Sequence, residues 1–433
     1  MTVNKITVVG GGLAGSEAAW QLARRNWQVD LWEMRPETTT PAHSTEQLAE
    51  LVCSNSLGSR DQVTASGLLQ EELRLLGSLM LECAGQSRVP AGAALAVNRE
   101  DFSRLVTERI AAHPNINLIR GRVSSIPPEP AIIATGPLTD SVLAQVLEEL
   151  TGRGFLYFYD AAAPIIYGET VNSSIVFAAS RYGKGEADYL NCPFSEEEYH
   201  LFWQQLSDAK QVALRAFEKN LYYEACLPVE ELARRGYRTL AFGPLRPVGL
   251  VDPRCGSEPF AVAQLRKEDV RGELLGMVGF QTNLTWPEQR RVFRLIPGLE
   301  SAEFARYGVM HRNTYVDGPK IFADNYRVKS RPGLYIAGQL AGVEGYLESV
   351  CSGLVAALDL HAREQGHALE LPGDTISAAL ARYVATSNRN FQPMNANFGL
   401  LPPAGGKNKK ERRTEQARKA QEEMFRFAKN LQG

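Results

Sequence analysis

The stretch that decides the fold is KITVVGGGLAGSEAAWQLARRNWQVDLWE, residues 5–33. Residues 6–9 form a short apolar, β-branched run, which predicts a buried parallel strand. Gly10, Gly12 and Gly15 follow with GxGxxG spacing, then a helix-forming segment SEAAWQLARRN and a second strand-like segment VDLWE. Strand, glycine turn, helix and strand in this order predict a dinucleotide-binding βαβ unit in an α/β fold.

The residues of this turn are the first predicted cofactor contacts. Glycines permit a tight turn, a close approach of backbone to a pyrophosphate, and close packing of helix on strand. The helix N-terminus then directs N–H groups at the phosphates. Glu33 ends the second strand eighteen residues after Gly15, where an acid can accept hydrogen bonds from the adenosine ribose. The predicted contacts are Gly10, Gly11, Gly12, Leu13, Ala14, Gly15 and Glu33.

Two later segments indicate which dinucleotide is bound. AIIATGPL (131–138) is a strand ending in Thr-Gly, and RPGLYIAGQLAGVEGYLESVCSGLVAALDL (331–360) is a strand, a Gly-rich turn and an apolar helix. Both resemble flavoproteins of the glutathione-reductase type, which implies that FAD is the resident cofactor. On that resemblance Gly338, Gly342 and Glu344 lie near its pyrophosphate–flavin half. No second GxGxxG exists, so no dedicated NAD(P)H domain is expected.

Tyr346 follows Glu344 by two residues in the same turn, and it could stack on the flavin or a pterin, or simply pack. With 433 residues the chain is expected to form more than one domain. We predict a Rossmann FAD-binding domain with an inserted α+β domain that covers one side of the flavin. Ser195 and Glu198 match a capping box in that insertion. The expected parts are 1–137 and 320–400 for the FAD-binding domain, 138–319 for the insertion, and 401–433 for a basic loop and helix.

Composition narrows the class of protein. Apolar residues make up 44% and charged residues 22%, as in soluble globular proteins. The N-terminus has no secretory pattern and no eighteen-residue apolar run exists, so we expect a cytoplasmic protein without a membrane span. Six cysteines without a CxxC predict reduced thiols and no metal site.

The net charge of −2 means that a nucleic-acid partner must meet a local basic patch. Residues 407–433 supply one, with nine Lys and Arg against four acids. The simpler interpretation of this segment is a solvated terminal helix, and the more specific one is contact with phosphates. The candidates for such contact with a nucleic acid are Lys409, Lys410, Arg412 and Arg413.

Two cysteines lie in loop-like segments. Cys53 stands in ELVCSNSLGSR, and Cys226 stands two residues before a proline and a predicted helix start, with several arginines following. A helix N-terminus or nearby Arg raises the thiolate fraction of a cysteine, which makes it a better nucleophile. Cys351 lies in an apolar helical pattern and is expected to pack as a small hydrophobe. The residues alone leave structural and catalytic roles for Cys53 and Cys226 equally open.

Five segments along the whole chain carry a more specific resemblance. VVGGGLAGSEAAWQ, LVCSNSLGS, YYEACLPVEELARRG, GFQTNLTWPEQRRVF and PMNANFGLLP resemble the folate- and FAD-dependent tRNA (uracil-5-)-methyltransferase family. The family implies conversion of the T-loop uridine (tRNA position 54) to ribothymidine. The methylene of 5,10-methylenetetrahydrofolate is carried on reduced FAD, and NAD(P)H reduces the flavin. The implied partners are the T-arm of tRNA and folate, with no membrane and no obligate protein partner.

This chemistry explains the need for thiols. Uracil C5 becomes nucleophilic when a thiolate adds at C6, and a second group must then remove the C5 proton. The resemblance implies Cys226 as the C6 nucleophile and Cys53 as base or as protector of the adduct, although the reverse order stays open. Three alternatives are a longer flavoprotein that modifies the wobble uridine with a GTPase, a small-molecule flavin oxidoreductase, and a non-catalytic flavin module that holds tRNA.

Overall fold

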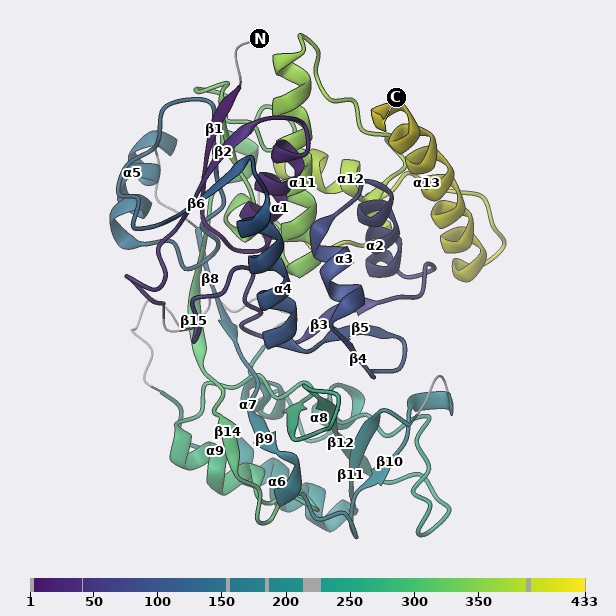
Figure 1. Cartoon of the computed structure of the whole chain (residues 1–433). Coiled ribbons are helices and arrows are strands. Elements are labelled where there is room, and N and C mark those ends of the chain that lie inside the picture. Colours follow the sequence, from purple (N-terminus) through teal and green to yellow (C-terminus); the bar gives the residue numbers. More distant parts are fainter. Residues whose placement is uncertain are drawn as a thin grey trace.

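The computed structural model describes residues 4–40, 42–152, 156–183, 187–212, 227–386 and 391–432. The chain forms two lobes joined by a long two-stranded ribbon (Figure 1). One lobe is built on a parallel sheet and the other on an antiparallel sheet, and each has its own hydrophobic core. The α/β class with an α+β insertion that the sequence predicts is therefore confirmed.

The parallel-sheet lobe contains the predicted βαβ unit. Its five strands are all parallel, in the order β16-β7-β1-β2-β6. Val8 on the central strand lies opposite Leu31 of β2 and Ile132 of β7, and all three side chains are buried. The strands are β1 (Lys5–Val9), β2 (Gln28–Glu33), β6 (Ile116–Arg120), β7 (Ala131–Ile133) and β16 (Leu334–Ile336).

Two helices lie side by side against this sheet, α1 (Leu13–Ala23) and α11 (Tyr346–Glu364) (Figure 1). They approach so closely that a Cβ on Gly353 would lie 2.1 Å from the carbonyl oxygen of Ala14. Only glycine permits this approach, because any side chain would collide with backbone. The two helix N-termini are thereby brought to the same end of the sheet.

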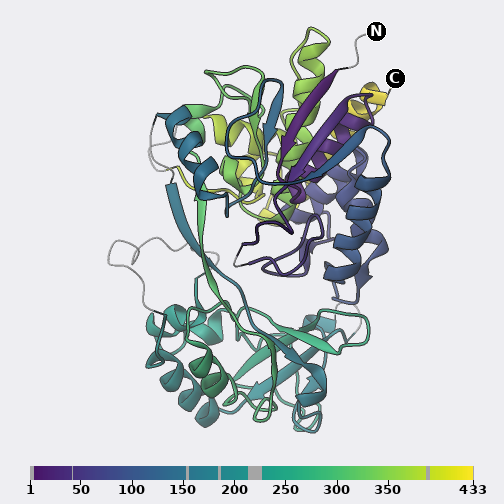
Figure 2. The same cartoon turned by 60° about the vertical axis from the view of Figure 1, so that its left-hand side comes forward.

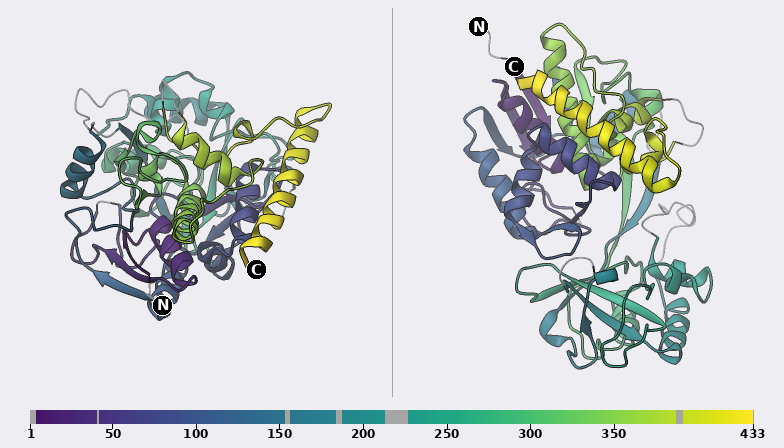
Figure 3. Two further views of the ribbon diagram at one scale, coloured as in Figure 1. Left: turned by 90° about the horizontal axis from the view of Figure 1, so that it is seen from above. Right: turned by 90° about the vertical axis from the view of Figure 1, so that its right-hand side faces the viewer.

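Further elements complete this lobe. A small antiparallel sheet consists of β3 (Ser56–Ser59), β5 (Ala94–Val97) and β4 (Arg88–Val89). The terminal helix α13 runs along α2, and its alanines and Met424 are buried in the same core (Figure 3). The remaining helices are α2 (Ala65–Leu75), α3 (Leu79–Gln86), α4 (Arg99–Ala112), α5 (Ser141–Thr151), α10 (Gly318–Ile321), α12 (Ile376–Ala385) and α13 (Lys409–Gln432).

The antiparallel-sheet lobe has six strands in the order β10-β11-β12-β13-β9-β14. The predicted capping box is confirmed, since the Ser195 side chain accepts from the Glu198 N–H and Glu198 accepts from the Ser195 N–H. The strands are β9 (Ile165–Tyr167), β10 (Phe177–Ala178), β11 (Tyr189–Phe194), β12 (Ala261–Lys267), β13 (Leu274–Met277) and β14 (Phe304–Arg306). The helices are α6 (Glu196–Ser207), α7 (Val229–Arg234), α8 (Thr239–Phe242) and α9 (Trp286–Phe293).

The ribbon between the lobes pairs β8 (Leu156–Ala161) with β15 (Met310–Tyr315) in antiparallel register (Figure 2). Leu143 and Leu147 of α5 pack in the core of the parallel-sheet lobe. The core of the other lobe begins at Ile166, so α5 belongs with the first lobe although it follows the expected boundary at residue 138. Among the described residues, no helix is long and apolar enough to cross a membrane.

Candidate active site

A cavity opens at the carboxyl ends of the parallel strands, where α/β folds place their ligands. It includes about 1100 Å³ of empty space, counting the open solvent at its mouth. The lining residues run up to Leu143 and resume at Gly338, so the antiparallel sheet supplies none of those described. The predicted residues that line it are Gly10, Gly12, Leu13, Ala14, Glu33, Gly338 and Tyr346.

The glycine turn forms one wall of the cavity. Helix α1 begins directly after Gly12, with no side-chain cap and no acid in its first turn, so its N-terminus presents a positive dipole end to the cavity. Gly10 has φ +104°, and a Cβ on Gly15 would lie 1.8 Å from the Gly10 carbonyl oxygen. Backbone N–H groups in this arrangement fit a diphosphate.

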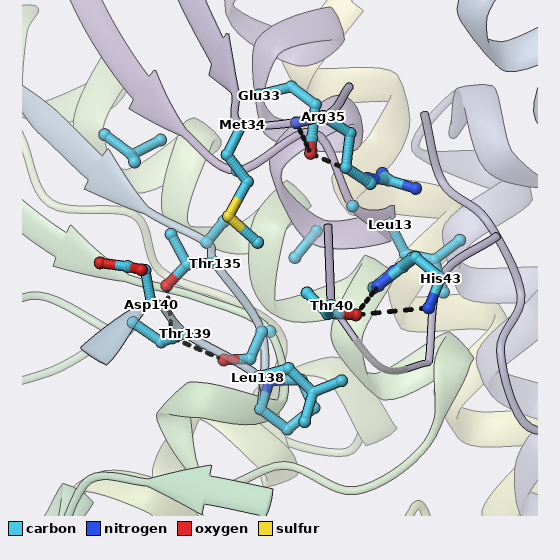
Figure 4. A pocket seen from close by; sticks show the side chains of 18 of the residues that line it. Leu13, Glu33, Met34, Arg35, Thr40, His43, Thr135, Leu138, Thr139 and Asp140 are labelled. Carbon is cyan, nitrogen blue, oxygen red and sulfur yellow. Dashed lines mark hydrogen bonds and ion pairs between the residues drawn. The ribbon is translucent and has the colours of Figure 1, made fainter. Parts of the chain in front are cut away.

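Glu33 lies at the end of β2 with its carboxylate held in place (Figure 4). Its Oε2 accepts from the Gly11 N–H at 2.9 Å, and its Oε1 accepts from the Arg35 N–H and Nε at 3.0 and 2.9 Å. Burial acts to raise the pKa of Glu33, but the hydrogen bonds and charge of Arg35 outweigh it and the pKa is lowered. The carboxylate is therefore ionised, with acceptor capacity left for a ribose hydroxyl.

Arg35 joins two acids of the cavity wall. Its side chain is only 2% exposed and also contacts Glu50 at 3.0 Å. Glu50 in turn accepts the N–H and hydroxyl groups of Ser44 and Thr45. A buried charged network thus fixes the loop beside Glu33.

The opposite wall is the turn between β16 and α11. Gly338 has φ +78° and donates its N–H to Ser352 Oγ at 2.7 Å. Gly342 has φ +89°, and a Cβ there would lie 2.5 Å from the Phe391 ring. Glu344 accepts from Gln339 Nε2 at 2.5 Å. Gly342 and Glu344 belong to this turn but do not line the cavity.

Tyr346 connects this turn to Cys53. Its hydroxyl accepts the N–H groups of Cys53 at 2.8 Å and of Ser54 at 3.1 Å, and it also lines the cavity. Burial raises the pKa of Tyr346 well above its usual range, so the phenol stays neutral. Cys53 is half-buried in the loop that precedes β3, and its neighbour Val52 lines the cavity. The thiol-bearing loop is thus fixed at the Tyr346 end of the cavity.

Arginines from both lobes surround this loop. Arg99 donates to the carbonyl oxygens of Leu51 at 2.8 Å and Cys53 at 3.4 Å, and to Glu268 at 2.8 Å. In the described part of the chain, the buried Nε and one terminal nitrogen of Arg306 have no hydrogen-bond partner. Burial, followed by repulsion from Arg99, lowers the pKa of Arg306, which also interacts with Cys53. Positive charge beside a cysteine favours its thiolate.

The other cysteines differ from Cys53. Burial raises the pKa of Cys83 to about 12 and that of Cys192 and Cys351 further, so these thiols stay protonated. Cys351 is fully buried in α11, which confirms the packing role expected for it. Cys255 is exposed. Cys226 lies outside the described residues.

The basic tail is on another part of the surface. Its four candidate residues are exposed at the start of α13, and Arg413 lies over the Phe398 ring at 5.5 Å. Figures 1 and 3 place α13 on the side of the parallel-sheet lobe opposite α5, whose start lines the cavity. The structure therefore does not bring these cations to the cavity: Lys409, Lys410, Arg412 and Arg413.

Sequence reasoning overlooked several lining residues. Thr40 and His43 contact each other at 2.6 Å across the cavity loop, and Thr135 contacts Thr139 at 2.7 Å (Figure 4). The segment PETTTPAHS has no periodic pattern, so nothing in it indicated Thr40 or His43. Thr135 belongs to the Thr-Gly strand end that did signal the cofactor site.

Comparisons with known proteins identify the family of this chain. A family model described as glucose inhibited division protein A matches residues 5–368. A protein of Natranaerobius thermophilus named methylenetetrahydrofolate--tRNA-(uracil-5-)-methyltransferase TrmFO is 56% identical over 97% of this chain and 99% of its own. The protein of the same name from Pelotomaculum thermopropionicum is 53% identical over 100% of both chains. The chain belongs to the TrmFO family.

Solved structures support the fold of this TrmFO family member. GidA of Aquifex aeolicus in its form II crystal superposes with a TM-score of 0.73 at 15% identity. The match covers 100% of this chain and 74% of the GidA chain. The form I crystal gives a TM-score of 0.72 at the same identity. At this identity the likeness concerns the fold alone.

Proposed function

We propose that this protein methylates C5 of the T-loop uridine of tRNA, taking the one-carbon unit from 5,10-methylenetetrahydrofolate. The observation that carries the proposal is 53–56% identity to TrmFO proteins over nearly the whole length of both chains. A dinucleotide cavity with a loop cysteine fixed at one end agrees with that chemistry. The wobble-uridine alternative has less support, since the relatives at 53–56% identity carry the name of a tRNA-(uracil-5-)-methyltransferase. Nothing in the described site favours a small-molecule oxidoreductase.

FAD is the proposed resident cofactor, and different residues of the cavity wall would hold its different parts. Glu33 would hold the adenosine ribose, the N-terminus of α1 the diphosphate, and the Gly338 turn with Tyr346 the flavin half. When bound, FAD supplies the reducing electrons obtained from NAD(P)H and carries the one-carbon unit. Tyr346 orients the Cys53 loop toward that end through its two accepted hydrogen bonds. A cytoplasmic location follows from the substrates.

The two thiols are proposed to activate the uracil ring of the substrate. The Cys226 thiolate adds to uracil C6, forming a C–S bond and leaving C5 enolate-like. C5 then forms a bond to the one-carbon unit, whose bond to its carrier breaks, the C5 proton passes to a base, and the C6–S bond breaks to release the thiolate. The hydride that converts the methylene into a methyl group would come from reduced FAD. Cys53 is proposed as that base or as protector of the adduct, in a loop that Arg99 holds through the carbonyl oxygens of Leu51 and Cys53. The basic tail from Lys409 to Arg413 is proposed to contact tRNA phosphates.

A transcript containing 5-fluorouridine tests the order of the two thiols. Because fluorine at C5 cannot leave as a proton does, the C6 adduct is expected to accumulate when methylenetetrahydrofolate and NADH are present. Peptide mapping by mass spectrometry should place the nucleotide on Cys226. The Cys255→Ser variant, which alters an exposed thiol, should form the same adduct. An adduct on Cys53 would reverse the assigned roles, and an adduct on neither would contradict thiol addition.

A further inference from the structure

Three aromatic rings stack in a row on the surface of the antiparallel-sheet lobe. Trp286 and Tyr307 have ring centroids 5.4 Å apart and an interplanar angle of 14°. Tyr307 and Phe304 have centroids 5.0 Å apart, also at 14°. Phe304 begins β14 and Trp286 begins α9, so two separate elements build this aromatic ladder of Phe304, Tyr307 and Trp286.

The ladder is anchored at one end and open at the other. Phe304 packs against the core of its lobe, and the Tyr307 hydroxyl accepts from Arg290 Nε at 3.1 Å. Trp286 at the outer end is 59% exposed, although one face of its ring is covered by Tyr307. A rigid, pre-stacked indole with a solvent-facing surface is what an incoming planar ring needs, because little conformational freedom is lost on contact.

The charge beside the ladder is positive. Arg291 is paired with Glu288 at 2.8 Å, whereas the exposed Arg290 donates to the Tyr307 hydroxyl. No acid among the described residues forms an ion pair with Arg290, which lies about one helical turn after Trp286. Aromatic rings next to an arginine are the chemistry by which proteins hold unstacked nucleobases and the phosphates between them.

We propose that the aromatic ladder is a stacking platform for an unpaired base of the RNA substrate, with Arg290 contacting an adjacent phosphate. The inference rests on the proposed function, because the T-loop is the source of the unpaired base. Figures 1 and 2 place α9 on the same side of the molecule as α5, whose first turn lines the cofactor cavity. Helix α5 belongs to the parallel-sheet lobe and α9 to the antiparallel-sheet lobe, so an RNA that contacts both must extend along this side of the molecule.

Binding of two RNAs tests the platform. The first is an unmodified T-arm stem–loop and the second is a duplex with the same stem and no loop, each followed by fluorescence anisotropy. Trp286→Ala is expected to weaken stem–loop binding about 5- to 150-fold, the range found when a stacked base loses its ring partner. Trp286→Phe should stay within a few-fold of the native protein. Duplex binding should be the same in all variants.

The control is Phe242→Ala, which removes a 75% exposed aromatic ring on α8 and should leave stem–loop binding unchanged. Native stem–loop affinity in Trp286→Ala, or equal weakening of both RNAs, overturns the platform. Formation of 5-methyluridine by the native protein is measured in parallel. If it forms while Trp286→Ala binds normally, only the platform fails. If the native protein forms none and binds neither RNA, the proposed function fails with it.

Discussion

The Gly15→Ala protein is expected to lose both bound flavin and stability, whereas Gly12→Ala should lose flavin alone. A Cβ at Gly15 would lie 1.8 Å from the Gly10 carbonyl oxygen, so backbone must move. Overpacking of this kind costs about 1–3 kcal/mol, which exceeds the gain in helix propensity from Ala. Nothing lies within 4 Å of a Cβ at Gly12, which faces the cavity with an ordinary φ of −73°.

The two variants distinguish a loss of folding stability from a loss of FAD binding. Flavin absorbance per mole of purified protein measures binding, and urea unfolding of flavin-free protein measures stability. Flavin-free Gly12→Ala should unfold like the flavin-free native protein. It should nevertheless bind FAD more weakly than the native protein, because its methyl group occupies the approach to the diphosphate. Equal stability of the two flavin-free variants would contradict the assignment of Gly15 to close packing.

Arg35→Met is expected to lower the free energy of unfolding by about 3–5 kcal/mol, the usual cost of removing one partner from a buried ion pair. The Arg35 side chain is 2% exposed and serves both Glu33, at 2.9 Å, and Glu50, at 3.0 Å. Without it the Glu33 carboxylate keeps only the backbone N–H groups of Gly11 and of residue 35, and it stays buried. FAD affinity should fall as well, since Glu33 would lose its fixed position.

The loss of unfolding free energy in Arg35→Met should depend on pH. In the native protein the pKa of Glu33 is lowered, so its stabilising contribution is present above the unfolded pKa and lost as pH falls through the folded value. Arg35→Met removes the side-chain hydrogen bond and the charge of Arg35, which leaves two backbone N–H groups to oppose burial, so the pKa of Glu33 should rise. The difference from native should therefore be larger at pH 8 than at pH 5, as measured by urea unfolding.

Arg418→Met is the matched control. Arg418 also contacts two acids, Glu415 at 2.7 Å and Glu422 at 2.5 Å, but its side chain is 53% exposed. Solvent screens such pairs, so this variant should unfold like the native protein at both pH values. If Arg35→Met were as harmless, the Glu33 network would have no role in holding the cavity wall.

The sequence predicted the parts of the fold that depend on neighbouring residues. The first two strands, the glycine turn and the helix after it follow from a local alternation of apolar run, glycines and helix formers. Ser195 and Glu198 are three residues apart, so their capping box could also be read directly. The buried position of Cys351 followed from its apolar helix.

Contacts between distant segments could not be predicted in this way. Tyr346 and Cys53 are 293 residues apart, and only the folded lobe brings the phenol to that N–H. The sequence left Tyr346 between stacking and packing, and the structure adds its hydrogen bonds to the Cys53 loop. Arg99 and Glu268, which also contact each other, are 169 residues apart. Glu344 lies in the expected turn and contacts Gln339, which lines the cavity, but Glu344 itself does not.

The measurement that tests the central claim most directly is mass spectrometry of nucleosides from an unmodified tRNA transcript. The transcript is incubated with flavin-loaded protein, NADH and isotope-labelled 5,10-methylenetetrahydrofolate, with Cys226→Ala and Cys255→Ala beside the native chain. We predict label in 5-methyluridine from the native protein and Cys255→Ala, and none from Cys226→Ala. Label from Cys226→Ala would remove that thiol as the required nucleophile. No label from the flavin-loaded native protein would contradict the methyltransferase account and favour a small-molecule oxidoreductase.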